Sequence, residues 1–440
     1  MLVYTIAYIV SYILSRISFN KVSGIVLIFA AIYIYRKRYK ESSNLLDLPG
    51  IYGLGFVAAQ GIACFKLSYL QNKWSPLTWL CLYLAYICPY ITYCILNRRF
   101  KYEKNKKSVA EIKAGISKRQ LNIIFVSVIL LTVVSLGAFI TEVAVLSYIP
   151  FFVRGVPHAY SYFHIRGVHY FTVSCVLIPS VSVIYTLYSE KLSKIKITVI
   201  STCTLISVLI PILCVSRFQL IFALICAVLT IIAIKKDIPL KLIIYTFLLL
   251  SVMYVILTVA RSHDVEYLNS IFEMRYDLPI FISQPYIYIS NNYDNFNYLV
   301  NNLSSFSFGL KSLYPIIALT GLKFYIPSLA DFQIYVVKEE LSTLTLIYDA
   351  YYDLGIVGII LFGILLGTVI YVLERLLYTK NNPIIYLIYA QITLYLMLAF
   401  FTTWFSNPTT WFYLGISVFI YISVFLKSLG DKNDNFKQIK

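Results

Sequence analysis

A succession of apolar stretches, separated by short polar turns, constrains the fold of this 440-residue chain more than any other feature. A helix needs about 20 mainly apolar residues to cross the hydrocarbon core of a bilayer. In this chain 60% of the residues are apolar and 13% are charged, whereas soluble domains carry about 25% charged residues. A soluble fold could not bury so much apolar surface behind so few charges, and we therefore expect lipid to be the main solvent of the chain.

The apolar stretches predict an all-α, polytopic transmembrane helical bundle of about twelve spans. Backbone polar groups in lipid must be satisfied within the spanning segment, which favours helices, and the alternating ~10-residue segments typical of a β-barrel are absent. The first stretch lacks the basic start and small-residue cleavage site of a signal peptide, so we expect it to be retained. The predicted spans lie near residues 2–19, 22–35, 45–65, 77–96, 120–146, 168–188, 197–215, 218–234, 239–259, 350–373, 383–403 and 410–427.

Basic clusters fall between alternate predicted spans, and this alternation predicts the orientation of the chain, with both termini in the cytoplasm. The inner segments hold 25 of the 37 basic residues and 9 of the 20 acidic residues, and the outer segments hold 12 and 11. Nearly all of the net charge of +17 is therefore positive-inside bias. It requires no nucleic acid as a partner.

This topology predicts three parts. Residues 1–259 contain spans one to nine, with an outer loop near 147–167 between spans five and six. Residues 260–349 form a large outer loop between spans nine and ten, and residues 350–440 contain spans ten to twelve and a cytoplasmic tail. The eight cysteines all fall within apolar stretches, so we expect them to be small buried side chains, not disulfides or zinc ligands.

The large outer loop is polar and rich in aromatic residues, with ten tyrosines, seven phenylalanines and seven asparagines. Many of them cluster in residues 285–298. Aromatic faces pack against sugar rings, and amide and phenol groups satisfy sugar hydroxyls, so the composition is compatible with saccharide binding. It is equally compatible with an interfacial belt that holds the loop to the membrane surface.

The charged and titratable residues of the outer segments are the candidate site residues. Arginine guanidinium groups match the geometry of phosphate oxygens, so these arginines are candidates for binding an anionic ligand. The alternative is that each arginine only extends its charge to the lipid headgroups. Asp353 follows the large loop and either caps the start of the next helix or serves as a base. Histidines offer proton transfer near neutral pH, and no metal site is expected because no thiol or carboxylate joins them in the first loop. The arginines are Arg154, Arg166, Arg217 and Arg261, and the histidines are His158, His164, His169 and His263.

The arrangement resembles the bacterial O-antigen polymerases (Wzy type, oligosaccharide repeat unit polymerases). Four features carry the resemblance: Tyr148-Ile-Pro-Phe-Phe-Val-Arg154 before a span, Ser216-Arg217-Phe218 between paired spans, the large late loop, and Asp353-Leu-Gly355-Ile-Val-Gly358 in the following helix. Each motif is short, so the arrangement carries the weight. It covers roughly residues 120–370 in local pattern.

The resemblance implies a glycosyltransferase of the bacterial inner membrane that acts on its periplasmic face in lipopolysaccharide or capsule-like polysaccharide biosynthesis. It would polymerise oligosaccharide repeat units held on undecaprenyl pyrophosphate, with membrane lipid and a chain-length regulator protein as further partners. Its substrate-binding residues would be Arg154, Arg166, Arg217, Arg261 and Asp353, and its catalytic base would be His263 or Asp264.

No cofactor is expected, because the lipid pyrophosphate is itself the leaving group and no Asp-x-Asp pair occurs on the outer side. An O-antigen ligase shares the layout and chemistry of the polymerase and remains an alternative. A lipid-linked oligosaccharide flippase or transporter is another, although its loops are expected to be shorter.

Overall fold

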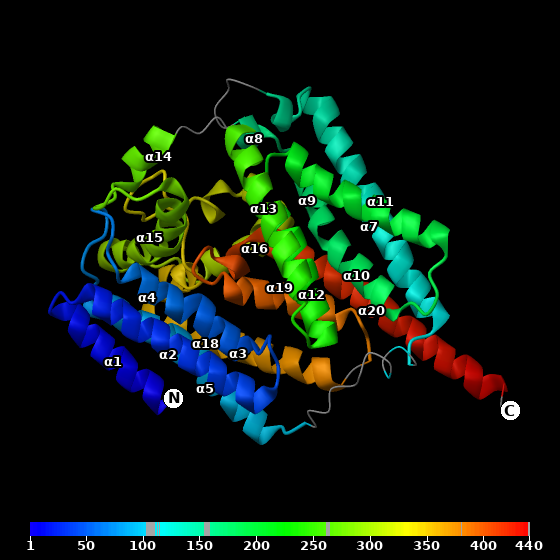
Figure 1. The fold of residues 1–440 in the computed structure, drawn as a ribbon, viewed down its shortest axis with the longest axis horizontal. Coiled ribbons are helices and arrows are strands. Elements are labelled where there is room, and N and C mark those ends of the chain that lie inside the picture. Colours follow the sequence, from blue (N-terminus) through cyan, green and yellow to red (C-terminus); the bar gives the residue numbers. More distant parts are fainter. Residues whose placement is uncertain are drawn as a thin grey trace. The chain divides into compact units, whose positions relative to one another are not determined.

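The computed structural model describes residues 1–102, 111, 113, 115–153, 159–260, 265–379 and 381–438, and this part of the chain is almost entirely helical (Figure 1). The all-helical prediction is confirmed. Several helices are apolar and of spanning length, as expected of a multi-pass membrane protein. Within the described residues, seven helices meet both criteria: Pro76–Arg99, Lys118–Leu146, Val168–Tyr188, Lys194–Leu213, Arg217–Lys235, Tyr348–Thr379 and Pro408–Leu426.

Each of the twelve predicted spans coincides with a helix or a run of helical segments. The span count and the orientation stay predictions. The second span differs most from expectation. It belongs to α2 (Asn20–Ser42), which continues through the basic cluster at residues 36–40 that the sequence had indicated as a loop.

The chain divides into two compact units, and unit one comprises residues 1–102, 264–374 and 395–411. In this unit α1, α2 and the continuous run of α3, a π-helical segment and α4 lie side by side (Figure 1). Its helices are α1 (Leu2–Arg16), α2, α3 (Leu48–Tyr52), α4 (Ala59–Ala63), α5 (Pro76–Arg99), α14 (Val265–Phe272), α15 (Ile280–Asn302), α16 (Leu310–Leu319), α17 (Leu322–Tyr325) and most of α18 (Tyr348–Thr379).

Side-chain caps explain where two of these helices begin. The Asp47 carboxylate accepts a hydrogen bond from the Gly50 amide at the start of α3 (3.0 Å). The Ser75 hydroxyl accepts one from the Thr78 amide at the start of α5 (3.2 Å), directly before Pro76. Serine and aspartate at this position satisfy amides that have no partner within the helix.

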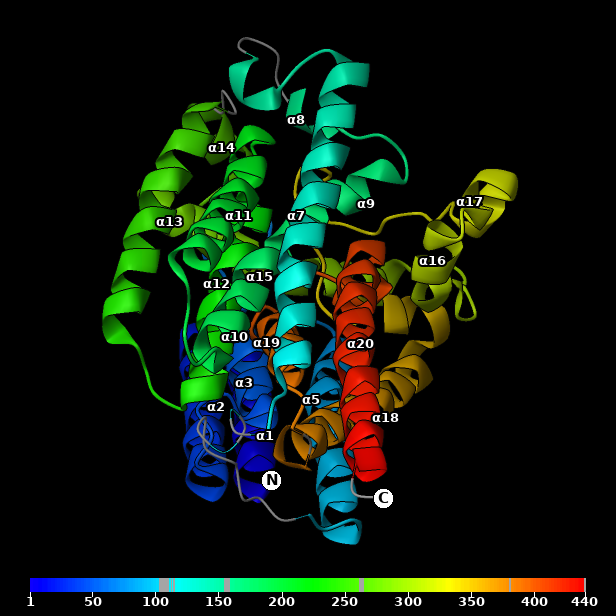
Figure 2. The ribbon, with the colours of Figure 1, turned by 90° about the vertical axis from the view of Figure 1, so that its right-hand side faces the viewer.

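Unit two comprises residues 103–263, 375–394 and 412–440. The axes of its helices α7, α13 and α20 are roughly parallel, and the chain runs along α20 in the opposite direction to α7 and α13 (Figure 2). A capping box formed by Ser117 and Gln120 begins α7. The helices are α7 (Lys118–Leu146), α8 (Ala159–Tyr162), α9 (Val168–Val173), α10 (Ile178–Tyr188), α11 (Lys194–Leu213), α12 (Arg217–Lys235), α13 (Leu240–Ala260), most of α19 (Ile385–Met397) and α20 (Pro408–Gln438).

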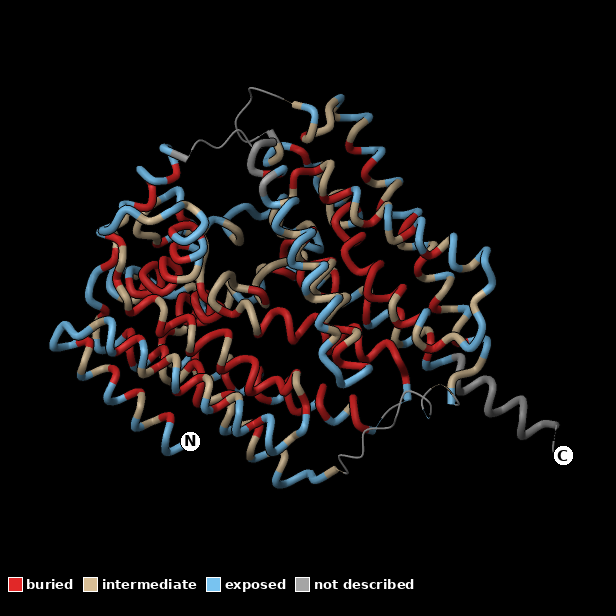
Figure 3. The backbone as a smooth tube through the Cα atoms, in the orientation of Figure 1, coloured by how far each residue is buried: buried red, intermediate tan, exposed pale blue. Residues whose placement is uncertain are grey.

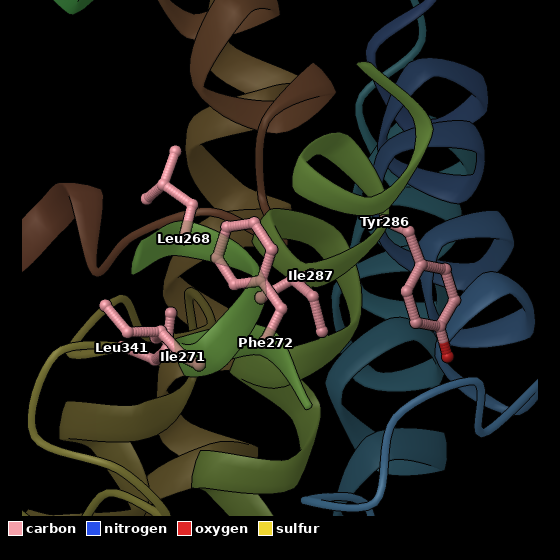
Figure 4. Close-up of a cluster of buried hydrophobic side chains, with 6 residues drawn as sticks. All are labelled: Leu268, Ile271, Phe272, Tyr286, Ile287 and Leu341. Carbon is pink, nitrogen blue, oxygen red and sulfur yellow. The ribbon is translucent and has the colours of Figure 1, made fainter. Parts of the chain in front are cut away.

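The predicted large loop is itself folded into helices. Its central helix, α15, is largely buried (Figure 3). A hydrophobic cluster joins α14, α15 and the connection before α18 that contains Leu341, and Phe272 and Ile287 point toward each other within it (Figure 4). Its buried members are Leu268, Ile271, Phe272, Tyr286, Ile287 and Leu341. The segment is therefore an ordered part of unit one with a core of its own.

Candidate functional site

Three of the seven predicted site residues belong to the described part of the chain. Arg166 and Arg217 lie in unit two, and Asp353 lies in unit one. Their surroundings are therefore given unit by unit. The other four lie outside the described residues, and their roles stay predictions: Arg154, Arg261, His263 and Asp264.

The clearest chemical grouping in unit two is a carboxylate–histidine pair. Glu142, in the last turns of α7, is fully buried, and its carboxylate lies 3.0 Å from Nδ1 of His169 on α9. The same carboxylate accepts hydrogen bonds from the Ile165 amide (3.0 Å) and the Thr172 hydroxyl (2.8 Å). Gly167, with φ of 81°, precedes α9 and supplies the left-handed turn between Ile165 and His169.

This geometry orients the imidazole ring of His169. An ionised carboxylate only accepts hydrogen bonds, so Nδ1 of the neutral ring carries the proton that faces Glu142. The lone pair then resides on Nε2. Because the His169 side chain is 33% exposed while Glu142 is not exposed at all, the pair combines a buried orienting group with an accessible proton acceptor. Such an arrangement is suited to general-base chemistry.

Arg166 and His164 lie in the same short segment. The rings of His164 and His169 are 6.3 Å apart between centroids. Arg166 is exposed and lines an open pocket of about 520 Å³ with five apolar or small residues, among them Gly167 and Phe171. A cation, two histidines and a buried carboxylate are thus brought together at one end of α7 and α9.

The proximity of Glu142 and His169 could have been predicted from the sequence. Glu142 ends predicted span five and His169 begins predicted span six, and consecutive spans joined by an outer loop have their outer ends on the same side of the membrane. Glu142 lies within the apolar stretch 120–146 and not in the outer segments from which the candidate residues were taken, so it was not paired with a histidine.

Arg217 is the first residue of α12, directly after Val215 and Ser216 at the turn from α11. Its Nη2 donates a hydrogen bond to the Leu257 carbonyl of α13 (3.3 Å), and its guanidinium lies 4.9 Å from the centre of the Tyr254 ring. A cation is unfavourable at a helix N-terminus, and these α13 groups compensate for it.

The first outer segment packs beside this corner. Phe151 and Tyr160 contact the small apolar cluster of Val215, Leu220 and Leu257. Arg217 is therefore next to the segment that also holds Arg166, although the described contacts do not include one between the two arginines.

Asp353 is buried in unit one, and its carboxylate accepts four hydrogen bonds. Two come from the Lys311 and Ser312 amides in the first turn of α16 (3.0 and 2.9 Å), and two come from the Ser307 and Ser312 hydroxyls (2.5 Å each). The expectation that Asp353 caps its own helix was wrong. Asp353 lies in α18 directly before a kink at Leu354 and Gly355, and its carboxylate accepts from amides of α16, so it caps α16 instead.

The asparagine- and tyrosine-rich stretch at residues 285–298 forms α15, and its central polar side chains are bonded within unit one. The Asn295 amide donates to the Leu341 and Thr343 carbonyls (2.7 and 2.9 Å), and the Tyr293 hydroxyl donates to the Phe56 carbonyl (2.6 Å). These groups are not available to sugar hydroxyls. Tyr288 and Tyr298 of the same helix remain exposed.

A buried ion pair at the same helix was not anticipated. Asp294 lies 2.6 Å from Nζ of Lys66 and also accepts hydrogen bonds from Gln71 (2.8 Å) and the Trp74 indole (2.7 Å). No local sequence pattern signals this contact, because the two charges are 228 positions apart.

No protein-family model matches the chain, and the comparisons with curated proteins and with solved structures found no match. Within the described ranges no group of three or more histidine, cysteine, aspartate or glutamate residues is arranged to hold a metal ion. The function is therefore inferred from the geometry and from the resemblance in sequence arrangement.

Proposed function

We propose that the protein is a glycosyltransferase of the bacterial inner membrane that polymerises oligosaccharide repeat units carried on undecaprenyl pyrophosphate. The observation that supports this best is the Glu142–His169 pair at the end of a helix of spanning length, with Arg166 three residues before the histidine. A positioned base and a nearby cation are the two groups that such a transfer requires.

In the proposed reaction, Nε2 of His169 removes the proton from the acceptor sugar hydroxyl. The hydroxyl oxygen attacks the anomeric carbon of the donor chain, and the bond from that carbon to the pyrophosphate oxygen breaks. The pyrophosphate departs with the bonding electron pair. Arginine guanidinium groups stabilise its increased negative charge, and Arg166 and Arg217 are the described candidates.

The predicted residues outside the described ranges keep their place in this proposal. His263 or Asp264 is the other candidate for the base, and Arg154 and Arg261 are further candidates for binding pyrophosphate. Asp353 is a weaker candidate for substrate contact than the sequence indicated, because both of its carboxylate oxygens already accept hydrogen bonds from unit one.

Deletion of the gene tests the proposal at the level of function. We expect the deletion strain to display the lipid core with a single repeat unit when its surface polysaccharide is separated on a gel. Bare core with lipid-linked polymer accumulating would instead favour a ligase, and the absence of both polymer forms would favour a flippase. Survival of the normal ladder of chain lengths would refute all three.

Complementation with point variants tests the site. His169→Asn should lower polymer formation by about 10²- to 10⁴-fold, the usual contribution of a general base. Glu142→Gln should lower it less, because the ring is retained but its orientation is weakened. His164→Asn is the matched control, since His164 is an exposed histidine of the same segment whose Nδ1 lies beside the Ser161 carbonyl and not beside a carboxylate. Equal activity of the His169 and His164 variants, at equal protein levels, would exclude His169 as the base.

A further inference from the structure

Unit one contains a basic pocket of about 410 Å³ that is lined by none of the predicted site residues. Three separate segments line it: residues 18–22 at the turn from α1 into α2, residues 65–66 after α4, and residues 275–276 between α14 and α15. Its charged lining residues are Lys21, Lys66 and Arg275, and no carboxylate is among the lining residues.

A short antiparallel bridge holds two of these segments together. The Tyr69 amide donates to the Glu273 carbonyl (2.9 Å), and the Arg275 amide donates to the Leu67 carbonyl (2.8 Å). The Arg275 side chain is fixed as well, because its Nε donates to the Ser68 carbonyl (3.1 Å). The guanidinium is thereby placed beside the pocket without using all of its five donors.

The charges of the pocket are only partly neutralised. Lys66 is buried and forms the ion pair with Asp294 described above. Lys21 and Arg275 are exposed, and each lies over an aromatic ring, at 5.2 Å from Tyr276 and 5.3 Å from Tyr69. Within the described part of the chain neither of these two side chains forms an ion pair. Two uncompensated positive charges therefore face the same cavity.

The first turn of α2 adds to this positive potential. The residue before the helix, Phe19, provides no side-chain cap, and the pocket lining includes residues 20–22, whose amides have no acceptor within the helix. These amides and the helix dipole favour an anion at this end of the 23-residue helix.

We propose that this pocket binds the phosphate or pyrophosphate group of an anion at the membrane surface. A tetrahedral anion with several acceptor oxygens satisfies the Arg275 guanidinium, the Lys21 ammonium and the α2 amides together, whereas a single carboxylate offers only two oxygens. Lipid headgroups and soluble polyphosphates share this chemistry. The inference does not depend on the proposed transferase function.

The test uses the full chain in nanodiscs of zwitterionic lipid. Inorganic pyrophosphate is the soluble probe, measured by thermophoresis, and phosphatidylglycerol is the lipid probe, measured by its retention in native mass spectrometry. The variant is Lys21→Ala/Arg275→Ala. The matched control is Lys323→Ala, which removes another cation of unit one that lies over the Tyr314 and Phe324 rings but does not line the pocket.

We expect the double variant to bind the probe about 100-fold more weakly, at about tenfold for each charged hydrogen-bond donor removed. The control should bind as the wild type does. If the double variant loses the pyrophosphate binding that the wild type shows, the site is assigned to a soluble anion or to a headgroup that exposes its phosphates. Loss of phosphatidylglycerol retention alone assigns it to a lipid headgroup.

The proposal is overturned if the wild type binds neither probe, or if the double variant binds both as well as the wild type does. If the double variant does not fold, Lys21→Gln alone serves the same purpose with an expected loss of about tenfold. Because binding is read on the purified protein, it is independent of whether the deletion strain loses polymer.

Discussion

The hydrogen bonds of Asp353 allow a quantitative prediction about the segment that follows α15. Asp353→Asn keeps the size of the side chain but replaces one acceptor oxygen with an amide that only donates. Of the four hydrogen bonds to Lys311, Ser312 and Ser307, two are then lost. A hydrogen bond to a charged group contributes about 1.5–3 kcal/mol. We therefore expect α16 to be destabilised by about 3 kcal/mol, the lower end of the range for two bonds.

Hydrogen exchange measures this effect at the affected atoms. The Lys311 and Ser312 amides lie in the first turn of α16, where amides have no acceptor within the helix. Their protection consequently depends on Asp353. A loss of about 3 kcal/mol corresponds to exchange about 100-fold faster in peptides that cover residues 307–319.

Asp331→Asn is the control, because Asp331 is an exposed carboxylate of the same segment. Unchanged protection of α16 in the Asp353 variant would refute the capping argument. If polymer formation were lost in that variant while protection stayed the same, Asp353 would act on the substrate, as the resemblance to the polymerases implies.

Two further predictions concern packing within unit one. Gly355→Ala should destabilise the protein by about 1–3 kcal/mol, because a φ of 60° with a ψ of −137° is accessible to glycine and strained for alanine. Thermal unfolding in detergent measures the loss of stability. The control is Gly137→Ala, at a helical glycine with no atom within 4 Å of the added carbon, which should be neutral or stabilising. Arg38→Ala should lower the free energy of unfolding by about 3–5 kcal/mol, since it leaves the Asp47 carboxylate buried and uncompensated. The same measurement on Arg36→Ala, which replaces an exposed arginine of the same helix, should show little change. Equal melting temperatures for the two variants would contradict the argument.

The sequence predicted the helical architecture well because lipid imposes a simple rule on it. A spanning segment must be helical and apolar over a set length, and both properties are visible in a single sequence. The burial of the cysteines was predicted in the same way, from the apolar stretches that contain them. All eight are free and buried or half-buried in the structure, as expected from their apolar surroundings.

Charge patterns in the sequence did not predict which charged residues form buried contacts. Arg38 was counted only as part of a basic inner cluster. In the structure its guanidinium donates to Asp47 at 2.9 and 2.7 Å and to the Tyr93 hydroxyl at 3.0 Å. The positive-inside rule depends on numbers of charges in loops, and it does not distinguish an arginine in solvent from one that turns into the bundle.

The asparagine-rich stretch shows why the burial of α15 could not be predicted from the sequence. Its polar composition indicates a surface, but Ser283, Ile287, Ser290 and Asp294 recur at helical spacing and are all buried. The partners that satisfy the most polar of these buried groups lie far away in the chain. The Asp294 carboxylate accepts from Lys66, Gln71 and Trp74, and the Asn295 amide donates to the Leu341 and Thr343 carbonyls. Without those partners, a buried amide is indistinguishable from an exposed one in the sequence.

The buried Lys66–Asp294 ion pair restricts how α15 can move. A buried ion pair adds little net stability, but it strongly disfavours arrangements in which either charge loses its partner. It therefore fixes α15 against the connection between α4 and α5, within the same unit as the basic pocket that contains Lys66. The pair therefore opposes any movement that separates α15 from this connection. Under the proposed function, a saccharide would have to be admitted by segments outside this helix or bind to surfaces that remain exposed on it, such as Tyr288 and Tyr298.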